Sequence, residues 1–189
     1  MTSSLLEIEP DTLRGTWEID PNHSTLAFSA KHAMVATVRG RFTGFSGSLT
    51  IDPDDPSRTT AEVDIEAASL DTRQADRDGH LRSPDFLDVE KHPRLTFRSK
   101  RAEAGSEPGT YRLWGDLTIR DITREVELDI EFQGLATDPF GNLRAGFEGV
   151  TVVNRKDWGL VWNVALEKGG ILVGEKVKLN LDVSAIKKS

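Results

Sequence analysis

Four histidines are the side chains of this sequence best suited to acid–base or metal chemistry, but their spacing does not assemble a site. His23, His32, His80 and His92 lie far apart in the chain, and none belongs to an HxH or HExxH pattern. His32 falls on the apolar parity of its expected strand, so we expect it to point inward as a buried, hydrogen-bonded structural histidine. The histidines therefore predict no metal site.

Nucleophiles and phosphate-binding loops are no better supported. The chain has no cysteine, which excludes disulfides, thiolate metal sites and cysteine nucleophiles. It has no GxSxG motif, and Gly40, Gly44 and Gly47 do not open a helix after a strand, as a dinucleotide-binding loop would. Most acidic residues occupy the polar side of alternating segments, where a solvated surface explains them. We therefore expect neither an enzyme nor a bound cofactor.

The composition is typical of one soluble domain. The 189 residues include 31 acidic and 24 basic ones, for a formal charge of −7. We place one domain over residues 1–189, with a core at about 15–186 and an N-terminal extension at 1–13. The negative charge argues against a nucleic-acid groove or an anionic membrane surface as partner.

Neither an export signal nor a membrane span is expected. The first residues contain one consecutive apolar pair, Leu5 and Leu6, where a signal peptide needs about 7–15 apolar residues. No stretch approaches the ~20 apolar residues of a spanning helix. We therefore expect a cytosolic location.

Alternation of apolar and polar residues is the strongest structural signal, and it is typical of strands with one buried face. In Glu125–Phe132, four apolar residues at even positions alternate with four carboxylates at odd positions. The same pattern predicts strands over His23–His32, Thr60–Ala67 and Val177–Val183. Less regular strands are expected at Gly15–Asp20, Gly40–Ile51, Arg94–Arg101, Thr110–Arg120 and Leu143–Val153. The internal glycines of Gly40–Ile51 predict a bulge or bend in that strand.

One charged segment breaks this alternation. Thr72–Asp88 contains good helix formers and a Ser83-Pro84 pair typical of a helix start, so we expect one or two short helices across the outside or one end of the sheet. Its mixture of charges and apolar anchors suits either a structural plug or a lid. A further turn is expected at Asn154–Gly159.

The strands must bury their apolar faces, in a two-sheet sandwich or in one sheet closed on itself. Closure also removes exposed edges, so we expect an all-β fold, an antiparallel β-barrel of about eight strands. Small residues on the inner parity favour a cavity: Ala30, Ala61, Ala67, Gly115, Ala145 and Gly149. Its expected lining is the set of long apolar side chains on that parity: Phe28, Val63, Ile65, Phe97, Leu117, Leu128, Ile130, Phe147, Leu179 and Leu181.

Short motifs follow one another through the chain in a distinctive order. They are Asp20-Pro21-Asn22-His23-Ser24 with Phe28 and His32; Val38-Arg39-Gly40-Arg41-Phe42 with Phe45 and Gly47; Arg77-Asp78-Gly79-His80-Leu81-Arg82-Ser83; Asp85-Phe86-Leu87-Asp88-Val89; His92-Pro93 and Phe97; Gly115-Asp116-Leu117-Thr118-Ile119 with Thr123-Arg124; and Asn154-Arg155-Lys156-Asp157-Trp158-Gly159-Leu160. Each motif alone is weak. Together they resemble the YceI family from about Trp17 to Val183.

This resemblance implies a lipocalin-like barrel that holds a long apolar ligand, such as a polyisoprenoid, an isoprenoid quinone or a related amphiphile, often in a homodimer. It supplies no family-wide catalytic residue. We assign seven residues to the pocket rim or lid: His23, His32, Arg77, His80, Phe86, Arg155 and Trp158. Many members carry an export signal, which this sequence does not show. Asp121 stands where the family usually has glycine, and because aspartate tolerates left-handed backbone we expect the hairpin to form.

Three functions stay open from the sequence. The first is a barrel that binds a lipid-like molecule for carriage, storage or sensing. The second is a barrel enzyme acting on a lipid-like substrate, which needs a titratable cluster deep in the cavity. The third is a packed scaffold that acts through its surface.

Overall fold

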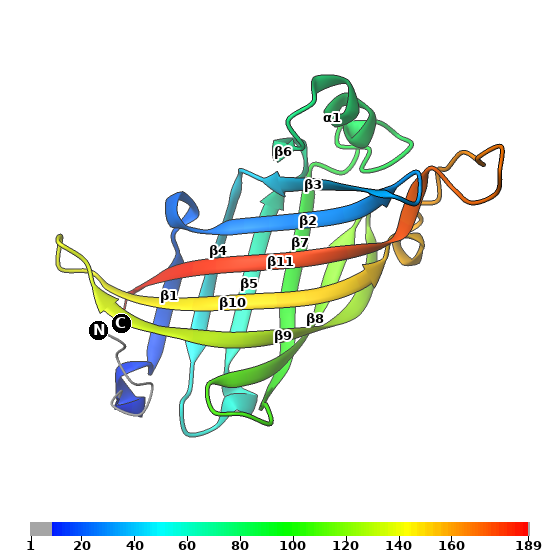
Figure 1. Ribbon diagram of the computed structural model, residues 1–189. Helices are drawn as coiled ribbons and strands as arrows, with labels where there is room; N and C mark the ends of the chain where they lie inside the picture. Colours follow the sequence, from blue (N-terminus) through cyan, green and yellow to red (C-terminus); the bar gives the residue numbers. More distant parts are fainter. Residues whose placement is uncertain (1–8, 189) are drawn as a thin grey trace.

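The structure is a computed structural model that describes residues 9–188. Antiparallel strands wrap into a barrel, with short helical segments at its ends (Figure 1). The strands are β1 (Gly15–Ile19), β2 (Thr25–His32), β3 (Ala36–Phe42), β4 (Phe45–Ile51), β5 (Thr60–Glu66), β6 (Leu70–Asp71), β7 (Arg94–Ala104), β8 (Thr110–Ile119), β9 (Ile122–Thr137), β10 (Leu143–Asn154) and β11 (Val173–Lys187). The helices are α1 (Ala75–Arg82) and the 3-10 turns η2 (Pro10–Thr12), η3 (Pro21–His23), η4 (Pro56–Arg58), η5 (Ala67–Ser69) and η6 (Arg155–Trp158).

Eight strands close into the barrel, in the order β1, β4, β5, β7, β8, β9, β10 and β11. Closure comes from antiparallel pairing of β1 with β11, in which Trp17–Ile19 lies opposite Ala185–Lys187. The same edge of β11 pairs farther along with β2, which carries β3 and β6 outside the closed ring. The expected all-β antiparallel barrel is confirmed.

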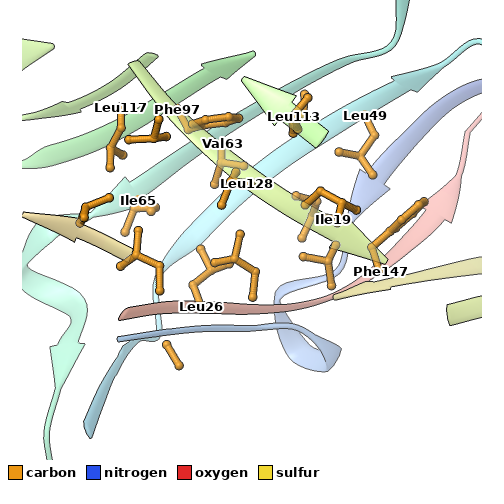
Figure 2. A pocket seen from close by; sticks show the side chains of 18 of the residues that line it. Ile19, Leu26, Leu49, Val63, Ile65, Phe97, Leu113, Leu117, Leu128 and Phe147 are labelled. Atoms are coloured by element: carbon orange, nitrogen blue, oxygen red, sulfur yellow. The ribbon is translucent and has the colours of Figure 1, made fainter. Parts of the chain in front are cut away.

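The alternation in β9 determines which of its faces is buried. Val126, Leu128 and Phe132 are buried, whereas the four alternating carboxylates of this strand are exposed. Leu128 lies opposite Leu113 of β8, and Figure 2 shows both side chains directed into the barrel interior. The predicted register of this strand is therefore confirmed.

The expected single strand Gly40–Ile51 is wrong. The chain turns at Thr43 and Gly44 and forms two strands, of which β3 pairs with β2 and β6 while β4 pairs with β1 and β5. The Gly44 carbonyl accepts a hydrogen bond from the Glu66 N–H at 2.8 Å. Gly44 therefore marks the corner between two strands and not a bend within one.

Asp121 takes the place expected of it in the β8–β9 hairpin. Ile119 pairs with Ile122, so Arg120 and Asp121 alone form the loop. Their backbone φ angles are 54° and 63°, in the left-handed region that two-residue hairpin loops require. Aspartate supports this hairpin, as expected.

The expected helical segment Thr72–Asp88 contains one helix, α1, followed by turns. Asp78 on α1 is buried, and its carboxylate accepts hydrogen bonds from the Thr72 N–H at 2.9 Å and the Thr72 hydroxyl at 2.5 Å. The expected one or two helices are thus one, because the chain after Ser83 forms turns. The turn expected at Asn154–Gly159 is η6.

The expected extension 1–13 lies partly outside the described residues. In the described part, Leu13 packs against Trp17, whose side chain is fully buried. The indole N–H of Trp17 donates a hydrogen bond to the Leu13 carbonyl at 2.9 Å. This part of the segment therefore covers the end of the barrel where β1 begins.

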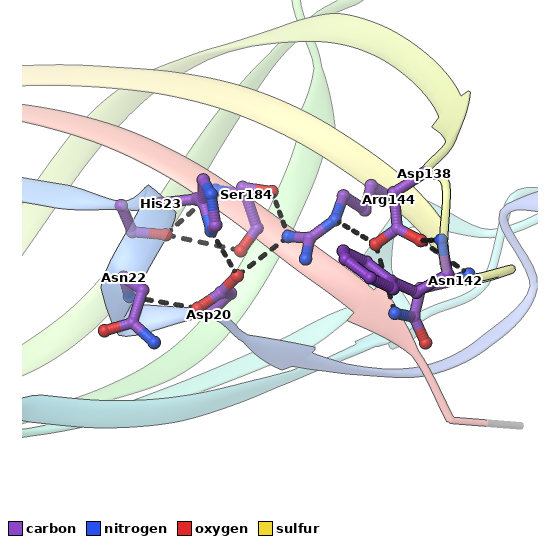
Figure 3. Close-up of polar contacts among 9 residues, drawn as sticks. Asp20, Asn22, His23, Asp138, Asn142, Arg144 and Ser184 are labelled. Atoms are coloured by element: carbon purple, nitrogen blue, oxygen red, sulfur yellow. Dashed lines mark hydrogen bonds and ion pairs between the residues drawn. The ribbon is translucent and has the colours of Figure 1, made fainter.

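Arg144 links three separate parts of the chain near that end of the barrel (Figure 3). Its guanidinium donates hydrogen bonds to Asp138 in the β9–β10 turn and to Asp20 after β1, both at 2.8 Å. It also donates to the Ser184 hydroxyl of β11 at 3.2 Å. The closing strands are thereby joined to the β9–β10 turn.

These contacts perturb both carboxyl groups. Hydrogen bonds from Arg144 are the main cause that lowers the pKa of Asp138 well below its ordinary range. Burial acts to raise the pKa of Asp20, but hydrogen bonds from Arg144 and His23 outweigh burial and lower it. The two carboxylates in turn raise the pKa of Arg144.

The strand register predicts a sharp contrast between neighbouring residues of β9. Leu128→Ala should lower the free energy of unfolding by about 2 kcal/mol or more, because a buried leucine loses its packing. Glu127→Lys on the outer face should change it by about 0.5 kcal/mol, since this carboxylate lies 3.8 Å from Arg112 in an exposed pair. Urea unfolding measures both values. Equal losses at the two positions would contradict the register.

The Arg144 contacts predict an acid-sensitive contribution to stability. Because the folded-state pKa values of Asp20 and Asp138 are lowered, their contribution is complete above the ordinary aspartate pKa of about 3.9 and is lost as pH falls below it. The difference in unfolding free energy between wild type and Arg144→Met should therefore be largest at neutral pH and shrink in acid. Arg112→Met is the control, whose difference should be small throughout. A wild-type-to-Arg144→Met difference independent of pH would contradict this account.

Candidate functional site

A cavity of about 1000 Å³ occupies the barrel interior. Inward-facing side chains of all eight barrel strands line it, and β2, β3, β6 and α1 add to the wall. The wall is almost entirely apolar, because the alternation in each strand directs its hydrophobic residues inward (Figure 2). This volume lies at the upper end of the range of about 300–1,000 Å³ typical of small-molecule sites.

All ten residues expected from parity lie on the cavity wall: Phe28, Val63, Ile65, Phe97, Leu117, Leu128, Ile130, Phe147, Leu179 and Leu181. That they contact a ligand stays a prediction. Sequence reasoning missed other wall residues, including Ile19, Leu49 and Leu113, which Figure 2 shows around the same interior as several of the ten. These three residues lie on strands whose alternation is less regular, so the sequence pattern indicated less clearly which of their side chains face inward.

The small residues on the inner parity play two different parts. Ala30 and Ala61 line the cavity, as expected of residues that leave space. Gly115 instead provides room for the ring of Phe97, which a Cβ at this position would strike. Ala145 is fully buried against the Trp17 cluster and does not line the cavity. Part of the small-residue signal therefore came from close packing.

Aromatic residues close the end of the barrel near α1. Trp158 is 2 % exposed, and its indole N–H donates a hydrogen bond to the Leu117 carbonyl at 2.9 Å. Phe86 is also buried, and its carbonyl accepts a hydrogen bond from Arg120 at 3.0 Å. Both side chains line the cavity. Of the two interpretations of the Thr72–Asp88 segment, this packing favours a structural plug.

Arg155 lies beside this plug and is 5 % exposed. It donates hydrogen bonds to the carbonyls of Leu160 at 2.6 Å, Gly174 at 2.9 Å and Val173 at 3.1 Å, and its side chain also lines the cavity. Burial lowers the pKa of Arg155, and the nearby charge of Glu175 offsets this only in part. The apolar cavity therefore has a buried cation at one end.

The seven expected rim residues do not form one cluster. His23 is exposed at the opposite end of the barrel, where it lies 2.7 Å from Asp20 (Figure 3). His32 is also exposed at the end of β2, so the expectation that it points inward is wrong. The last two residues of β2, Lys31 and His32, are both exposed, and the pairing of β11 with this end of β2 shifts in register between Val173 and Val177.

Arg77 and His80 lie near the plug but not on the cavity wall. Arg77 donates hydrogen bonds to the Thr72 hydroxyl and carbonyl, both at 2.7 Å, and so holds the chain that precedes α1. His80 stands edge-on to Trp162 with ring centroids 4.5 Å apart, and its Nε2 lies 2.9 Å from Asp85. Both residues therefore support the plug from outside.

Few titratable side chains reach the cavity. Within residues 9–188 its wall includes only Asp52, Tyr111 and Arg155 among such groups. Asp52 lies in the β4–β5 loop, where its carboxylate accepts hydrogen bonds from the N–H groups of Asp54 and Asp55, at the end of the barrel away from Arg155. The wall thus places no acid beside a base in the part that the structure describes.

The described residues hold neither a metal-type cluster of side chains nor a helix suited to span a membrane. No group of three or more histidine or acidic side chains there has the arrangement of a metal site. None of the described helices is both long and apolar enough to cross a membrane.

Known proteins resemble this chain over most of its length. A UPF0312 protein of Staphylococcus epidermidis is 37% identical over 163 residues, which cover 86% of this chain and 92% of the relative. A UPF0312 protein of Pseudomonas aeruginosa is 36% identical over 165 residues, covering 87% of this chain and 82% of the relative.

Solved structures share the fold. Burkholderia cenocepacia BcnA superposes with a TM-score of 0.75 at 21% identity, covering 88% of this chain and 98% of BcnA. The Campylobacter jejuni YceI protein gives 0.69 at 27% identity, covering 84% and 90%. A domain from Saccharophagus degradans described as polyisoprenoid binding gives 0.68 at 12% identity, covering 91% and 98%.

The family comparison agrees with the motifs and with the barrel. The YceI-like domain matches residues 17–185, which include every strand of the closed ring except the first residues of β1 and the last of β11. The chain therefore belongs to the YceI-like domain family.

Proposed function

We propose that the protein binds the tail of one long lipid-like molecule inside the barrel, namely a polyisoprenoid, an isoprenoid quinone or a related amphiphile. The observation that carries this proposal is the apolar cavity of about 1000 Å³. The polyisoprenoid-binding neighbour from Saccharophagus degradans supports the same class of ligand. Carriage, storage and sensing of this ligand are all consistent with such a cavity.

Burial of the tail supplies the affinity. Micromolar binding requires about 8 kcal/mol, and association costs a further ~4–15 kcal/mol. At about 0.8 kcal/mol per buried CH₂, the tail must then bury on the order of 15–29 carbon atoms. This corresponds to about three to six isoprene units. Such contacts recognise chain length more than chemical detail.

The polar end of the ligand belongs beside Arg155. A guanidinium has five N–H donors and no acceptor, and three of those of Arg155 bind carbonyls within the described residues. A buried cation gains free energy from an acceptor or an anion placed next to it. A hydroxyl, carbonyl, carboxylate or phosphate head group supplies one.

The two alternatives receive less support. A barrel enzyme needs an acid and a base together deep in the cavity, whereas Asp52 and Arg155 lie at opposite ends of the described wall. The family and its polyisoprenoid-binding neighbour also favour a binding protein. A packed scaffold would have its interior filled by side chains, whereas this barrel encloses about 1000 Å³.

The expected homodimer and the expected cytosolic location stay predictions. Sedimentation velocity measures the first and cell fractionation the second.

Blocking the cavity should abolish binding. Affinity for a series of prenyl alcohols should rise at least about tenfold per isoprene unit until the chain fills the barrel, because each unit buries further apolar carbon. Ala61→Trp should remove this binding, since Ala61 is a buried residue of the wall. Displacement of a fluorescent fatty probe measures the affinities.

The matched control lies one residue along the same strand. Glu62 is exposed on the outer face of β5, so Glu62→Trp should bind as wild type does. His80→Ala should also retain binding, because His80 lies off the cavity wall. Affinity that ignores chain length, or binding that His80→Ala removes and Ala61→Trp spares, would overturn the carrier function in favour of an enzyme.

Removal of the buried cation should change head-group preference. Arg155→Met should lower affinity for prenyl phosphates at least tenfold relative to prenyl hydrocarbons of equal length, because only the former use the guanidinium. The ratio of the two affinities, measured by the same displacement assay, corrects for any general loosening of the plug. An unchanged ratio would show that the head group lies elsewhere.

A further inference from the structure

Basic side chains gather on the outer face of β11, β2 and β3, towards the end that carries the 160–172 loop. Strand pairing places Lys178, Ser29 and Arg39 in one row across the three strands. Lys176 lies one outward position farther along β11, and Lys31 one position farther along β2. All four basic residues are exposed, and the described residues place no carboxylate in ion-pair contact with any of them.

Carboxylates occupy the other end of the same sheet face. Glu131, Glu148 and Asp182 form one row across β9, β10 and β11, and all three are exposed. Lys178 and Asp182 are four residues apart on β11, which is about 13 Å along a strand. This exceeds the Debye length of about 8 Å at physiological salt, so the two ends of the face act separately on a charged partner.

Exposed apolar side chains adjoin the basic end. Met34 and Val35, at the tip of the β2–β3 turn, are 58% and 83% exposed. Val161 and Val164, in the 160–172 loop, are 61% and 47% exposed. Figure 1 shows this loop (orange) projecting from the barrel next to the β2–β3 turn. The exposed apolar side chains thus lie together at one end of the molecule.

Hydrogen bonds hold the two segments together. The Ala33 N–H donates to the Leu172 carbonyl at 2.7 Å, and the Leu172 N–H donates to the Val164 carbonyl at 2.9 Å. The loop also reaches the barrel interior, since buried Leu160 lines the cavity and exposed Val161 follows it directly in the chain. The β2–β3 turn and the 160–172 loop therefore form one hydrogen-bonded end of the molecule.

We propose that this end, formed by Met34, Val35, Val161 and Val164 with Lys31, Arg39, Lys176 and Lys178 beside them, docks the protein on an anionic lipid bilayer. Exposed apolar side chains next to lysine and arginine are the combination that binds the interface of such membranes. Docking places the plugged end of the cavity against the bilayer.

Charge favours a bilayer over a second copy of the chain. A two-fold interface brings the same patch of both subunits together, so unpaired lysines and arginines would face one another. An anionic bilayer instead offers the opposite charge over the whole patch. The formal charge of −7 does not prevent this contact, because the row of Glu131, Glu148 and Asp182 lies beyond the screening distance and Glu175, next to Lys176, is paired with Lys156 at 2.6 Å.

Vesicle sedimentation of the full chain tests the proposal. The protein should sediment with phosphatidylcholine vesicles that contain about 30 mol% phosphatidylglycerol and hardly at all with pure phosphatidylcholine. Binding should fall at about 1 M salt, where the Debye length is about 3 Å. Lys176→Glu/Lys178→Glu should weaken the partition coefficient more than tenfold, and Lys176→Gln/Lys178→Gln should weaken it less. Met34→Ser/Val35→Ser should weaken it without changing its salt dependence.

Matched controls come from the opposite end of the barrel. Phe140 is 88% exposed in the β9–β10 turn and Arg58 is exposed in the β4–β5 loop, so Phe140→Ser and Arg58→Glu should bind vesicles as wild type does. Prenyl-alcohol binding in solution should be unchanged in the lysine variants, which separates this proposal from the function of the cavity. Absence of sedimentation, equal binding to neutral vesicles, equal losses in the controls, or a dimer that Met34→Ser/Val35→Ser dissociates would each overturn it.

Discussion

The pairing of β1 with β11 is the contact on which the rest of the structure depends. Three residues of each strand meet there, and without them the sheet would be open and β1 would be one of its exposed edges. Once the sheet closes, the apolar residues of every alternating strand face the interior and the polar residues face water. Trp17 is buried in this junction and packs against Ala145 of β10 and Ala185 of β11. Their small side chains give the indole its space.

Closure also determines how the two ends differ. The edge of β11 is longer than β1 can cover, so β2 pairs with the remaining part and the chain leaves the ring towards α1. Near the junction, Arg144 and two carboxylates hold the ends of strands together. At the other end, the chain packs Phe86, Trp158 and Arg155 across the interior. One end is joined by ion pairs, and the other is filled by aromatic rings around a cation.

The distribution of charged residues over the surface matters more for a partner than the net charge of the chain. The net charge is negative, yet basic and acidic residues occupy different ends of one sheet face. At physiological salt a partner experiences only the charges within about 8 Å of its contact. The proposed bilayer contact at the basic end adjoins the end of the apolar interior where the Arg155 guanidinium is buried.

The sequence by itself determined the β class, the inward and outward faces of the regular strands and the apolar wall, because alternation is a local property of each strand. Parity placed all ten expected lining residues, such as Leu128 and Leu179, on the cavity wall. The motif order also identified the family. The YceI-like domain match over residues 17–185 rests on this same information.

Only the tertiary structure decided the rest. Parity could not show that Gly115 provides room for Phe97 while Ala61 leaves open space, because the difference lies in a neighbouring strand. Parity also could not show that His23 and His80 lie at opposite ends of the barrel, because their positions depend on which strands close the ring. The division at Gly44 and the grouping of Lys178 with Arg39 follow from pairing between strands distant in sequence. Such pairings are chosen by the whole closed sheet, since each strand's partner depends on where every other strand has gone.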